Sequence, residues 1–211
     1  MRFTRKSLSR FNGRDGMPAY IAFEGKVYDV SESPLWRNGK HQVVHEAGRD
    51  LTGELDKAPH DKEMLDKFPV VGEFLWYEEI EHTADAGIRA YGATIDELFE
   101  NCAYGMHSIM LENYDVSKSK EGSFDFELES DTLEALLVKW LNELLFYFET
   151  KSLVFSDFVV KLNKKLKAKA SFEEYDEKKH GYATLIKAVT YHNLEIRKEK
   201  DIYVVEVIFD V

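Results

Sequence analysis

The sequence changes character abruptly near residue 72, and this break constrains the fold more than any single motif does. Residues 1–72 hold all four prolines and carry 12 basic and 11 acidic side chains. Residues 73–211 hold no proline and carry 16 basic and 28 acidic side chains. Domain boundaries fall where composition shifts and where glycine or proline interrupts regular structure. We therefore expect two domains, 1–74 and 75–211, joined within the stretch FPVVGEFLWY.

The overall composition excludes several classes of protein. The 211 residues are 44% hydrophobic and carry a net charge of -11, so the chain should fold, and strong direct binding to nucleic acid is not expected. The single cysteine, Cys102, excludes an internal disulfide and a cysteine-rich zinc site, and it fits a reducing compartment. We find neither a signal peptide nor a membrane-spanning stretch, and we expect a cytoplasmic protein without membrane association.

The first part of the chain predicts a small α+β domain. A short helix is expected between Thr4 and Phe11, and AYIAFEGKVYDV reads as a hairpin around a Glu24-Gly25 turn. After Trp36 the pattern becomes helical and polar, and residues 48–68 suggest two short helices on either side of a proline.

The second part predicts an α+β domain with two helices packed on a largely antiparallel sheet. Residues 94–110 form an amphipathic pattern that begins with the capping-box residues Thr94 and Glu97. A second helix is expected from Asp131, as its N-cap, to Phe148. The expected strands are 76–81, 87–92, 122–130, 152–161, 166–174, 183–191 and 202–209.

Three histidines in the first part are candidate ligands. His41 and His45 are four residues apart and would share one face of a helix, and His60 follows a proline at the start of the next predicted helix. Histidines from two facing helical turns can ligate a haem iron from both sides. A zinc ion bound by His41 and His45 would lack further ligands, and three ordinary surface histidines are the structural alternative.

Residues 2–74 resemble the cytochrome b5-like haem/steroid-binding family. The resemblance lies in PAYIAFEGKVYDVSESPLW, in GKHQVVHEAGRDLTGELDKAPH and in FPVVGEF. It implies a bound haem b or a steroid-like ligand, and His60 matches the second axial histidine of the family. The family's usual His-Pro-Gly-Gly motif is replaced here by residues 38–41, so the first axial ligand is either His45 or His41. Our hypothesis is ligation through His60 and His45.

Carboxylates form the second candidate site. His82-Thr83-Ala84-Asp85 lies between two predicted strands, and the last strand ends with Asp210 and the carboxylate of Val211. If the last strand neighbours the first hairpin of the domain, three carboxylates meet. Unit charges about 4 Å apart repel by about 4 kcal/mol at an effective dielectric constant near 20, and a bound Ca²⁺ or Mg²⁺ would offset this repulsion. The alternative is an ordinary turn aspartate and a frayed end of the chain.

Residues 77–211 resemble the archease family. The resemblance is carried by EHTADAGIRAYGATIDELFENCAYGM, KWLNELLFYFE, IKAVTYH and the final VIFDV. It implies a divalent cation, usually Ca²⁺, bound by Asp85, Asp210 and Val211. It also implies an accessory protein that is not itself an enzyme. Archeases activate the RtcB-type RNA ligase of tRNA splicing by promoting the ligase's guanylylation and turnover, so association with tRNA would be indirect.

Two functions are therefore expected from the sequence. The first is activation of an RNA ligase by the second domain. The alternative is an electron-transfer module that binds haem or a small ligand in the first domain, with the second domain as an appended partner-binding part.

Overall fold

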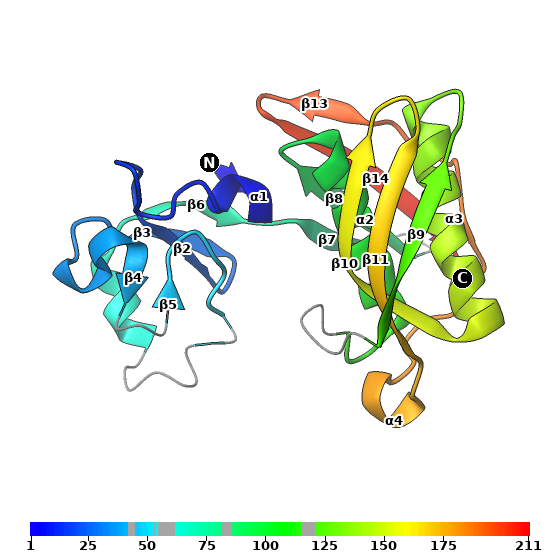
Figure 1. Ribbon diagram of the computed structural model, residues 1–211, viewed down its shortest axis with the longest axis horizontal. Coiled ribbons are helices and arrows are strands. Elements are labelled where there is room, and N and C mark those ends of the chain that lie inside the picture. The colour runs from blue at the N-terminus through cyan, green and yellow to red at the C-terminus, as the bar shows by residue number, and fades with distance from the viewer. Residues whose placement is uncertain (42–44, 53, 55–61, 82–85, 115–120) are drawn as a thin grey trace. The chain divides into compact units, whose positions relative to one another are not determined.

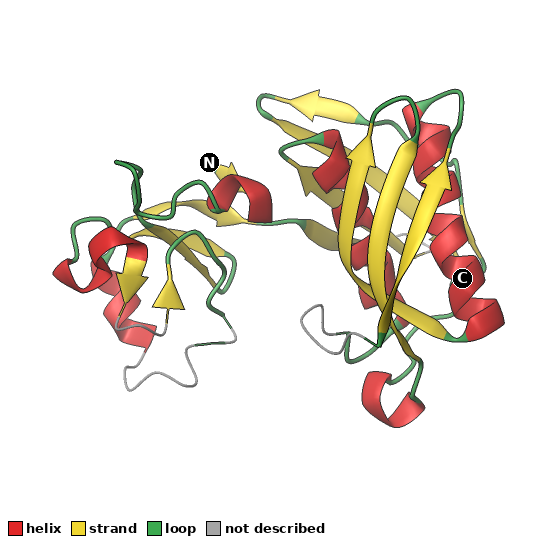
Figure 2. Cartoon of the chain, in the orientation of Figure 1, coloured by secondary structure: helices red, strands yellow, loops and turns green. Residues whose placement is uncertain are grey.

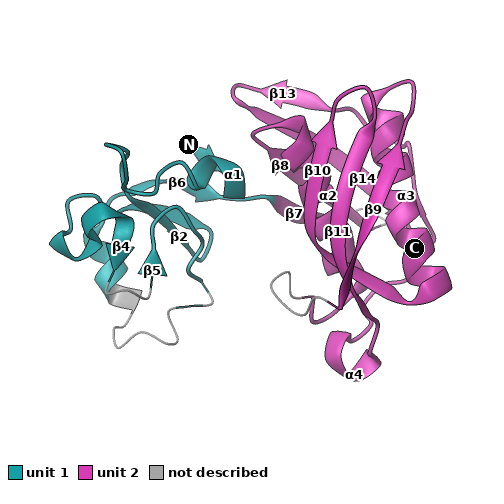
Figure 3. Ribbon diagram, in the orientation of Figure 1, with its two compact units in different colours: residues 1–76 teal, residues 77–211 magenta. Residues whose placement is uncertain are grey.

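The structure is a computed structural model that describes all residues except 42–44, 53, 55–61, 82–85 and 115–120. The chain divides into two compact units, Met1–Trp76 and Tyr77–Val211, which are described separately below (Figure 3). Helices and sheets occur together in both units, so the expected α+β class is confirmed (Figure 2). Among the described residues, no helix combines the length and apolar character needed to span a bilayer.

The first unit is built on a four-stranded sheet with the strand order β1-β6-β3-β2. Its strands are β1 (Arg2–Phe3), β2 (Tyr20–Phe23), β3 (Lys26–Asp29) and β6 (Val70–Phe74). The remaining elements are α1 (Arg5–Leu8), the 3-10 helices η1 (Pro34–Gly39) and η3 (Lys62–Lys67), and the short strands β4 (Lys40–His41) and β5 (His45–Glu46). The first strand pairs in parallel with the last, so both ends of the unit belong to one sheet.

The predicted hairpin and the first helix are confirmed. Strands β2 and β3 are antiparallel, and the turn residues Glu24 and Gly25 have φ angles of 47° and 74°. Two consecutive positive φ angles match the right-handed twist of the flanking strands. Thr4 caps α1, since its hydroxyl accepts a hydrogen bond from the backbone N–H of Ser7.

The prediction of helix after Trp36 is wrong for the two histidines. His41 and His45 lie on β4 and β5, where they are directly opposite each other in an antiparallel pair. The polar sequence around them suits a helix surface or an exposed hairpin equally well, so the local pattern could not distinguish the two. Of the two short helices expected between residues 48 and 68, the structure shows only η3, and much of that range lies outside the described residues.

The second unit contains two antiparallel sheets, where the sequence suggested one. The first sheet has the order β12-β14-β8-β7 with β13 also paired to β14, and the second has the order β10-β11-β9. The strands of the first sheet are β7 (Tyr77–Glu81), β8 (Ala86–Gly92), β12 (Ala188–Val189), β13 (Arg197–Glu199) and β14 (Ile202–Asp210). Those of the second are β9 (Gly122–Leu128), β10 (Leu153–Leu162) and β11 (Leu166–Glu174). The helices are α2 (Ile95–Met110), α3 (Leu133–Lys151) and α4 (Glu177–His180).

Helix α2 packs against both sheets (Figure 1). A Cβ atom added at Gly105 would lie 2.9 Å from the side chain of Ile88 on β8, so a small residue is required at this crossing. Cys102 is buried on the same helix, and burial raises the pKa of its thiol. The sequence-based interpretation of Cys102 as a structural core residue therefore agrees with its position.

A row of polar side chains on α2 covers the outer edge of β10. Four side chains, spaced four or three residues apart on the helix, accept hydrogen bonds from backbone N–H groups of the strand. The pairs are Asp96 with Leu162 at 3.0 Å, Glu100 with Val160 at 2.9 Å, Tyr104 with Phe158 at 3.2 Å and His107 with Phe155 at 3.4 Å. Four helical residues rise about 6 Å and two strand residues about 6.7 Å, so the first three pairs remain in step, and the fourth follows an irregularity in the strand. The helix thus occupies the place of a further strand at an edge that would otherwise be open.

The starts of the two long helices differ in how well the sequence predicted them. Thr94 caps α2 as expected, and its hydroxyl accepts from the backbone N–H of Glu97 at 3.2 Å. The N-cap of α3 is Thr132, whose hydroxyl accepts from Ala135 at 3.1 Å, so the assignment of Asp131 is wrong by one residue. Aspartate and threonine are both good N-cap residues, so the sequence alone could not show which of the neighbours Asp131 and Thr132 caps the helix.

The predicted strand 183–191 is reduced to the two residues of β12. The surrounding segment, residues 182–196, runs along α3 in the opposite direction. The ring of Tyr182 stacks near Phe148, the amide of Val189 donates to Asn142, and the amide of Ile196 donates to Glu134. The segment divides its hydrogen bonds between β14, α3 and the end of α2, so its alternating sequence forms only a two-residue strand.

Candidate functional site

The carboxylates near the end of the chain lie where β14 meets two other strands. The ladder between β8 and β14 runs without interruption to the pair Phe209 and Ala86. Asp210 follows directly, pairs with Ala188 of β12, and is exposed. The strand is therefore ordered up to Asp210, and the frayed end considered from the sequence does not occur.

Lys187 holds the last residue of the chain in place. Its backbone N–H donates to the carbonyl oxygen of Asp210 at 2.8 Å, and its ammonium group donates to an oxygen of Val211 at 2.8 Å. From the sequence, Lys187 is expected on a strand in a structural role, and no part in the cation site is predicted for it. The signal that could have identified it is its place within the IKAVTYH stretch, which carries part of the resemblance to archeases.

Asp85, the third predicted ligand, lies outside the described residues, and so does His82. Within the described part of the chain, no group of three or more His, Cys, Asp or Glu side chains is placed to hold a metal ion. The described candidates at this end are the Asp210 carboxylate and the Val211 oxygen. All-oxygen ligands are those that Ca²⁺ and Mg²⁺ prefer, so the donor chemistry fits a hard divalent cation.

In the first unit, two of the three predicted histidines are brought together. The ring centroids of His41 and His45 are 5.9 Å apart with an interplanar angle of 22°, and the ring of Trp36 stacks on His41 at 5.0 Å. His45 is 8% exposed, and its Nε2 atom is 4.0 Å from a carboxylate oxygen of Glu54. His60 lies outside the described residues.

The stacked geometry limits what the two histidines can do together. Axial ligands of one haem point their nitrogen atoms at the iron from opposite sides. Parallel rings stacked face to face do not present their nitrogens in that way. His41 and His45 therefore do not form an axial pair with each other, and a haem held by either of them needs a ligand from elsewhere.

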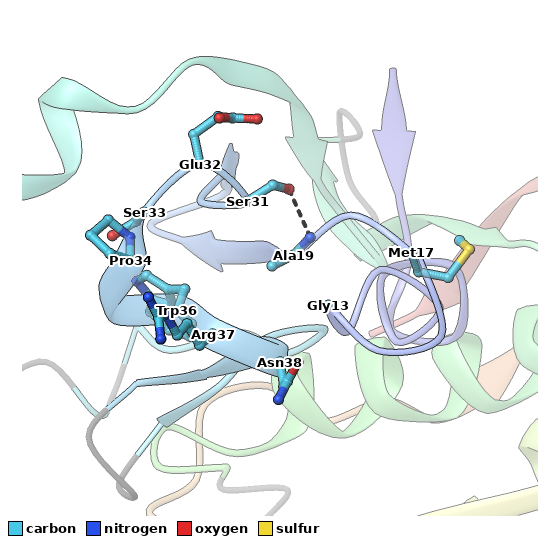
Figure 4. A pocket seen from close by; sticks show the side chains of 10 residues that line it. All are labelled: Gly13, Met17, Ala19, Ser31, Glu32, Ser33, Pro34, Trp36, Arg37 and Asn38. Carbon is cyan, nitrogen blue, oxygen red and sulfur yellow. Dashed lines mark hydrogen bonds between the residues drawn. The ribbon is translucent and has the colours of Figure 1, made fainter.

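A surface hollow of about 310 Å³ is lined in part by Trp36 (Figure 4). The described residues that line it include Gly13, Met17, Trp36 and Arg37, and no histidine. The hydroxyl of Ser31, also in its wall, accepts from the backbone N–H of Ala19 at 2.9 Å. Neither His41 nor His45 is therefore among the described residues that line the hollow, although Trp36 both lines it and stacks on His41.

A buried ionisable cluster in the second unit was not foreseen. The Nε2 atom of His180 lies 3.0 Å from Glu173, whose other carboxylate oxygen accepts from Lys179. Burial acts to raise the pKa of Glu173, but the bonds from His180 and Lys179 outweigh it and hold that pKa below its usual value. The cluster lines a cavity of about 90 Å³ and ties α4 to β11.

Comparison with known proteins places both halves of the chain. Residues 77–211 match the model of the Archease protein family, and residues 4–75 match that of the Cytochrome b5-like Heme/Steroid binding domain. The protein archease of Methanosarcina acetivorans is 41% identical over 141 residues, which are 64% of this chain and 95% of that protein.

Two solved structures cover one half each. A solution structure of a Methanobacterium thermoautotrophicum protein matches 64% of this chain and 98% of its own, with 34% identity and a TM-score of 0.53. A Hadesarchaea cytochrome b5 domain protein matches 35% of this chain and 97% of its own, with 55% identity and a TM-score of 0.35. The chain belongs to the archease family through residues 77–211, and a cytochrome b5-like domain precedes that part.

Proposed function

We propose that the archease domain activates an RtcB-type tRNA-splicing RNA ligase, by promoting its guanylylation and turnover, and that it does so as a cytoplasmic accessory protein. Asp85, Asp210 and Val211 would hold a divalent cation, with Ca²⁺ the expected ion. The resemblance of the domain to archeases supplies the partner. The geometry at the end of β14 supports the site.

The observation that carries the site is the register of β8 and β14. Ala86 is paired with Phe209. Asp85 precedes the first of these residues in the sequence, and Asp210 follows the second. In an antiparallel ladder such residues are the next to face each other, so the register favours a meeting of the two carboxylates.

A hard cation, when bound, would neutralise these carboxylates and offer positive charge to a phosphate group of the partner or its nucleotide. The protein's own residues set the position of the oxygen ligands. The β8–β14 ladder fixes the backbone of Asp210, and Lys187 orients Val211.

The charge of the domain supports association with an RNA-binding enzyme. Residues 73–211 carry 28 acidic and 16 basic side chains. An RNA-binding enzyme presents basic surfaces to its substrate, and opposite charges speed protein encounter. Stimulation of the ligase should accordingly weaken as ionic strength increases.

The test is multiple-turnover RNA ligation by an RtcB-type ligase with and without this protein. Asp85→Asn and Asp210→Asn should each reduce the stimulation by at least about 10- to 100-fold, the range known for lost support of a metal site. The control is Asp201→Asn, which removes an exposed carboxylate at the β13–β14 turn and should stimulate like the wild type. Circular dichroism checks that all variants fold.

Full stimulation by both ligand variants would refute the cation site while leaving the partner intact. A wild-type protein that fails to stimulate any ligase would refute the proposed function itself.

We also propose that the first domain binds haem b through His60 and His45, as an electron-transfer module. The burial of His45 favours it as the ligand over His41, whose ring is stacked between Trp36 and His45.

Protein supplied with haem should show the absorbance spectrum of a low-spin, six-coordinate iron. His60→Ala and His45→Ala should lose this spectrum, and His41→Ala should retain it. If His41→Ala loses the low-spin spectrum and His45→Ala retains it, the first axial ligand is His41 and not His45. If the wild type does not show the spectrum, the haem hypothesis is wrong.

A further inference from the structure

Beyond the first turn of α3, the archease domain exposes four large apolar side chains on this helix and on the segment that runs along it. Phe146 is 52% exposed, Tyr182 40%, Leu185 51% and Tyr191 63%. We call these four residues the exposed ridge. Single exposed apolar residues are common on protein surfaces, but a group of them marks an interaction site.

The contacts of α3 locate the segment that carries Tyr182, Leu185 and Tyr191 along the helix that carries Phe146. Tyr182 stacks near Phe148, and Val189 donates to Asn142. Phe146 lies one helical turn from Asn142 and on the same face of α3. The part of the segment that contains Leu185 passes this turn of the helix, between the two points at which the segment is attached.

The ridge continues to the proposed cation site. Leu185 lies two residues before Lys187, whose ammonium group bonds to Val211. Ile186 between them is buried, whereas both Leu185 and Lys187 are exposed. Alternation along the chain thus turns Leu185 toward the same side as Lys187.

The charged residues one helical turn from Phe146 are acidic. Glu143 and Glu149 lie three residues before and after Phe146 on α3, so they flank it on the helix surface. Asp210 lies beside the segment through its pairing with Ala188. The only cation of the segment 182–191 is Lys187, which is engaged with Val211.

We propose that the exposed ridge is the docking surface for the protein partner of the proposed function, through an apolar patch with a basic rim on that enzyme. This inference rests on the proposed activation of an RNA ligase and adds the surface by which the two proteins join. Interface centres are rich in aromatic and apolar residues, and their rims carry complementary charge.

The acidic residues beside the ridge favour a basic protein surface over nucleic acid or a second copy of this chain as the partner that binds there. Nucleic acid would need cations for its phosphates, and the acidic flanks repel it. A second copy of this chain would bring the same acidic surface, and like charges disfavour that contact. A basic protein surface satisfies both the apolar centre and the acidic flanks.

The experiment compares substitutions at equally exposed positions on different faces of the same domain. Leu185→Glu and Phe146→Ser change the ridge. Val159→Glu changes the outer face of β10, where the wild-type residue is 52% exposed. The dissociation constant of the full-length protein with an RtcB-type ligase is measured by calorimetry, and ligation is measured in parallel. Circular dichroism confirms that each variant is folded.

Both ridge variants should bind the ligase more than tenfold more weakly, and Val159→Glu should bind within about twofold of the wild type. Asp210→Asn should keep most of the binding and lose the stimulation, which separates docking from the cation site.

If both ridge variants bind like the wild type, or if Val159→Glu loses as much binding as they do, the ridge is not the docking surface, and the proposed function still stands. Concentration-dependent dimers of the wild type that Leu185→Glu abolishes would also overturn it, because they would assign the ridge to a second copy. A wild-type protein that neither binds nor stimulates the ligase would remove the proposed function and this inference with it.

Discussion

At the scale of single residues, the second domain contains buried polar side chains on α2 that accept hydrogen bonds from backbone N–H groups of β10. Glu100, Tyr104 and His107 lie on the buried side of α2, where a simple hydrophobic pattern predicts only apolar contacts. Each accepts a hydrogen bond from β10. A buried N–H group left without a partner costs about 1–3 kcal/mol, so these residues stabilise the sheet edge mainly by preventing that loss.

Replacement of Glu100 by alanine should lower the free energy of unfolding by about 1–3 kcal/mol, because the amide of Val160 loses its acceptor. Glu100→Gln keeps an oxygen atom at the same position and should restore much of the stability. Glu149→Ala, an exposed change on α3, serves as the control. Urea unfolding measures all three, and equal stability of Glu100→Ala and Glu149→Ala would contradict the role of the bond.

His107 should make the domain sensitive to acid. Burial lowers its pKa to about 4, although its bond to the Ala103 carbonyl acts in the opposite direction. The ring is neutral in the folded protein, and in the unfolded chain its pKa is about 6.5. Below pH 6.5 the imidazole of His107 therefore becomes protonated in the unfolded chain but stays neutral in the folded protein. The free energy of unfolding decreases until the pH reaches the pKa of His107 in the folded protein.

Relative to His107→Gln, the wild type should lose about 1.4 kcal/mol of stability for each pH unit between 6.5 and 4. Chemical unfolding of both proteins across this range measures the difference, in which the other titrating groups largely cancel. Parallel pH profiles of the two proteins would contradict the prediction, because they would show that folding does not change the pKa of His107.

At the scale of elements, the hydrophobic periodicity of the sequence predicted the positions of the long helices and strands. Predictions from local sequence were wrong where a segment could form either of two structures of similar free energy. The helix 94–110 and the strands around residues 122–128, 153–162, 166–174 and 202–210 were predicted within a few residues. The segment 183–191 alternates like a strand, yet only two of its residues form one, and its hydrogen bonds go to β14, to α3 and to the end of α2. Its partner was chosen by packing, which a local pattern does not contain.

The start of α3 offers a test at this scale. Thr132→Ala removes the acceptor for the Ala135 amide and should cost about 1 kcal/mol of unfolding free energy. Asp131→Ala changes the neighbouring residue that the sequence suggested as N-cap, and it should cost only a few tenths of that amount. Thermal and urea unfolding compare the two variants. A larger loss in Asp131→Ala would restore the assignment made from the sequence.

At the scale of the whole molecule, the chain consists of two units that each have a core of their own. The first unit has two clusters of buried residues, one around Ile21 and Trp36 and the other around Phe3 and Val27. In the second unit Trp140 is fully buried, and its indole N–H donates to the carbonyl of Phe99 at 3.2 Å. Units with separate cores are expected to fold independently.

Residues 77–211 should therefore fold alone and stimulate the RNA ligase as well as the full chain does. Circular dichroism and the ligation assay check the two statements. Stimulation that is lost in the fragment although the fragment is folded would mean that the first domain takes part in activation, and would favour regulation by its ligand.

The sequence by itself determined the two-part organisation, the α+β class and most regular elements, because composition and periodicity are properties of a chain before it folds. It also named Asp210 and Val211 as candidate ligands, through a resemblance. Only the tertiary structure decided that α2 closes the edge of β10, that His41 and His45 stack across a hairpin, and that Lys187 bonds to Val211. Each of these contacts joins residues on different elements, and their free energy depends on distances that are set when those elements pack together.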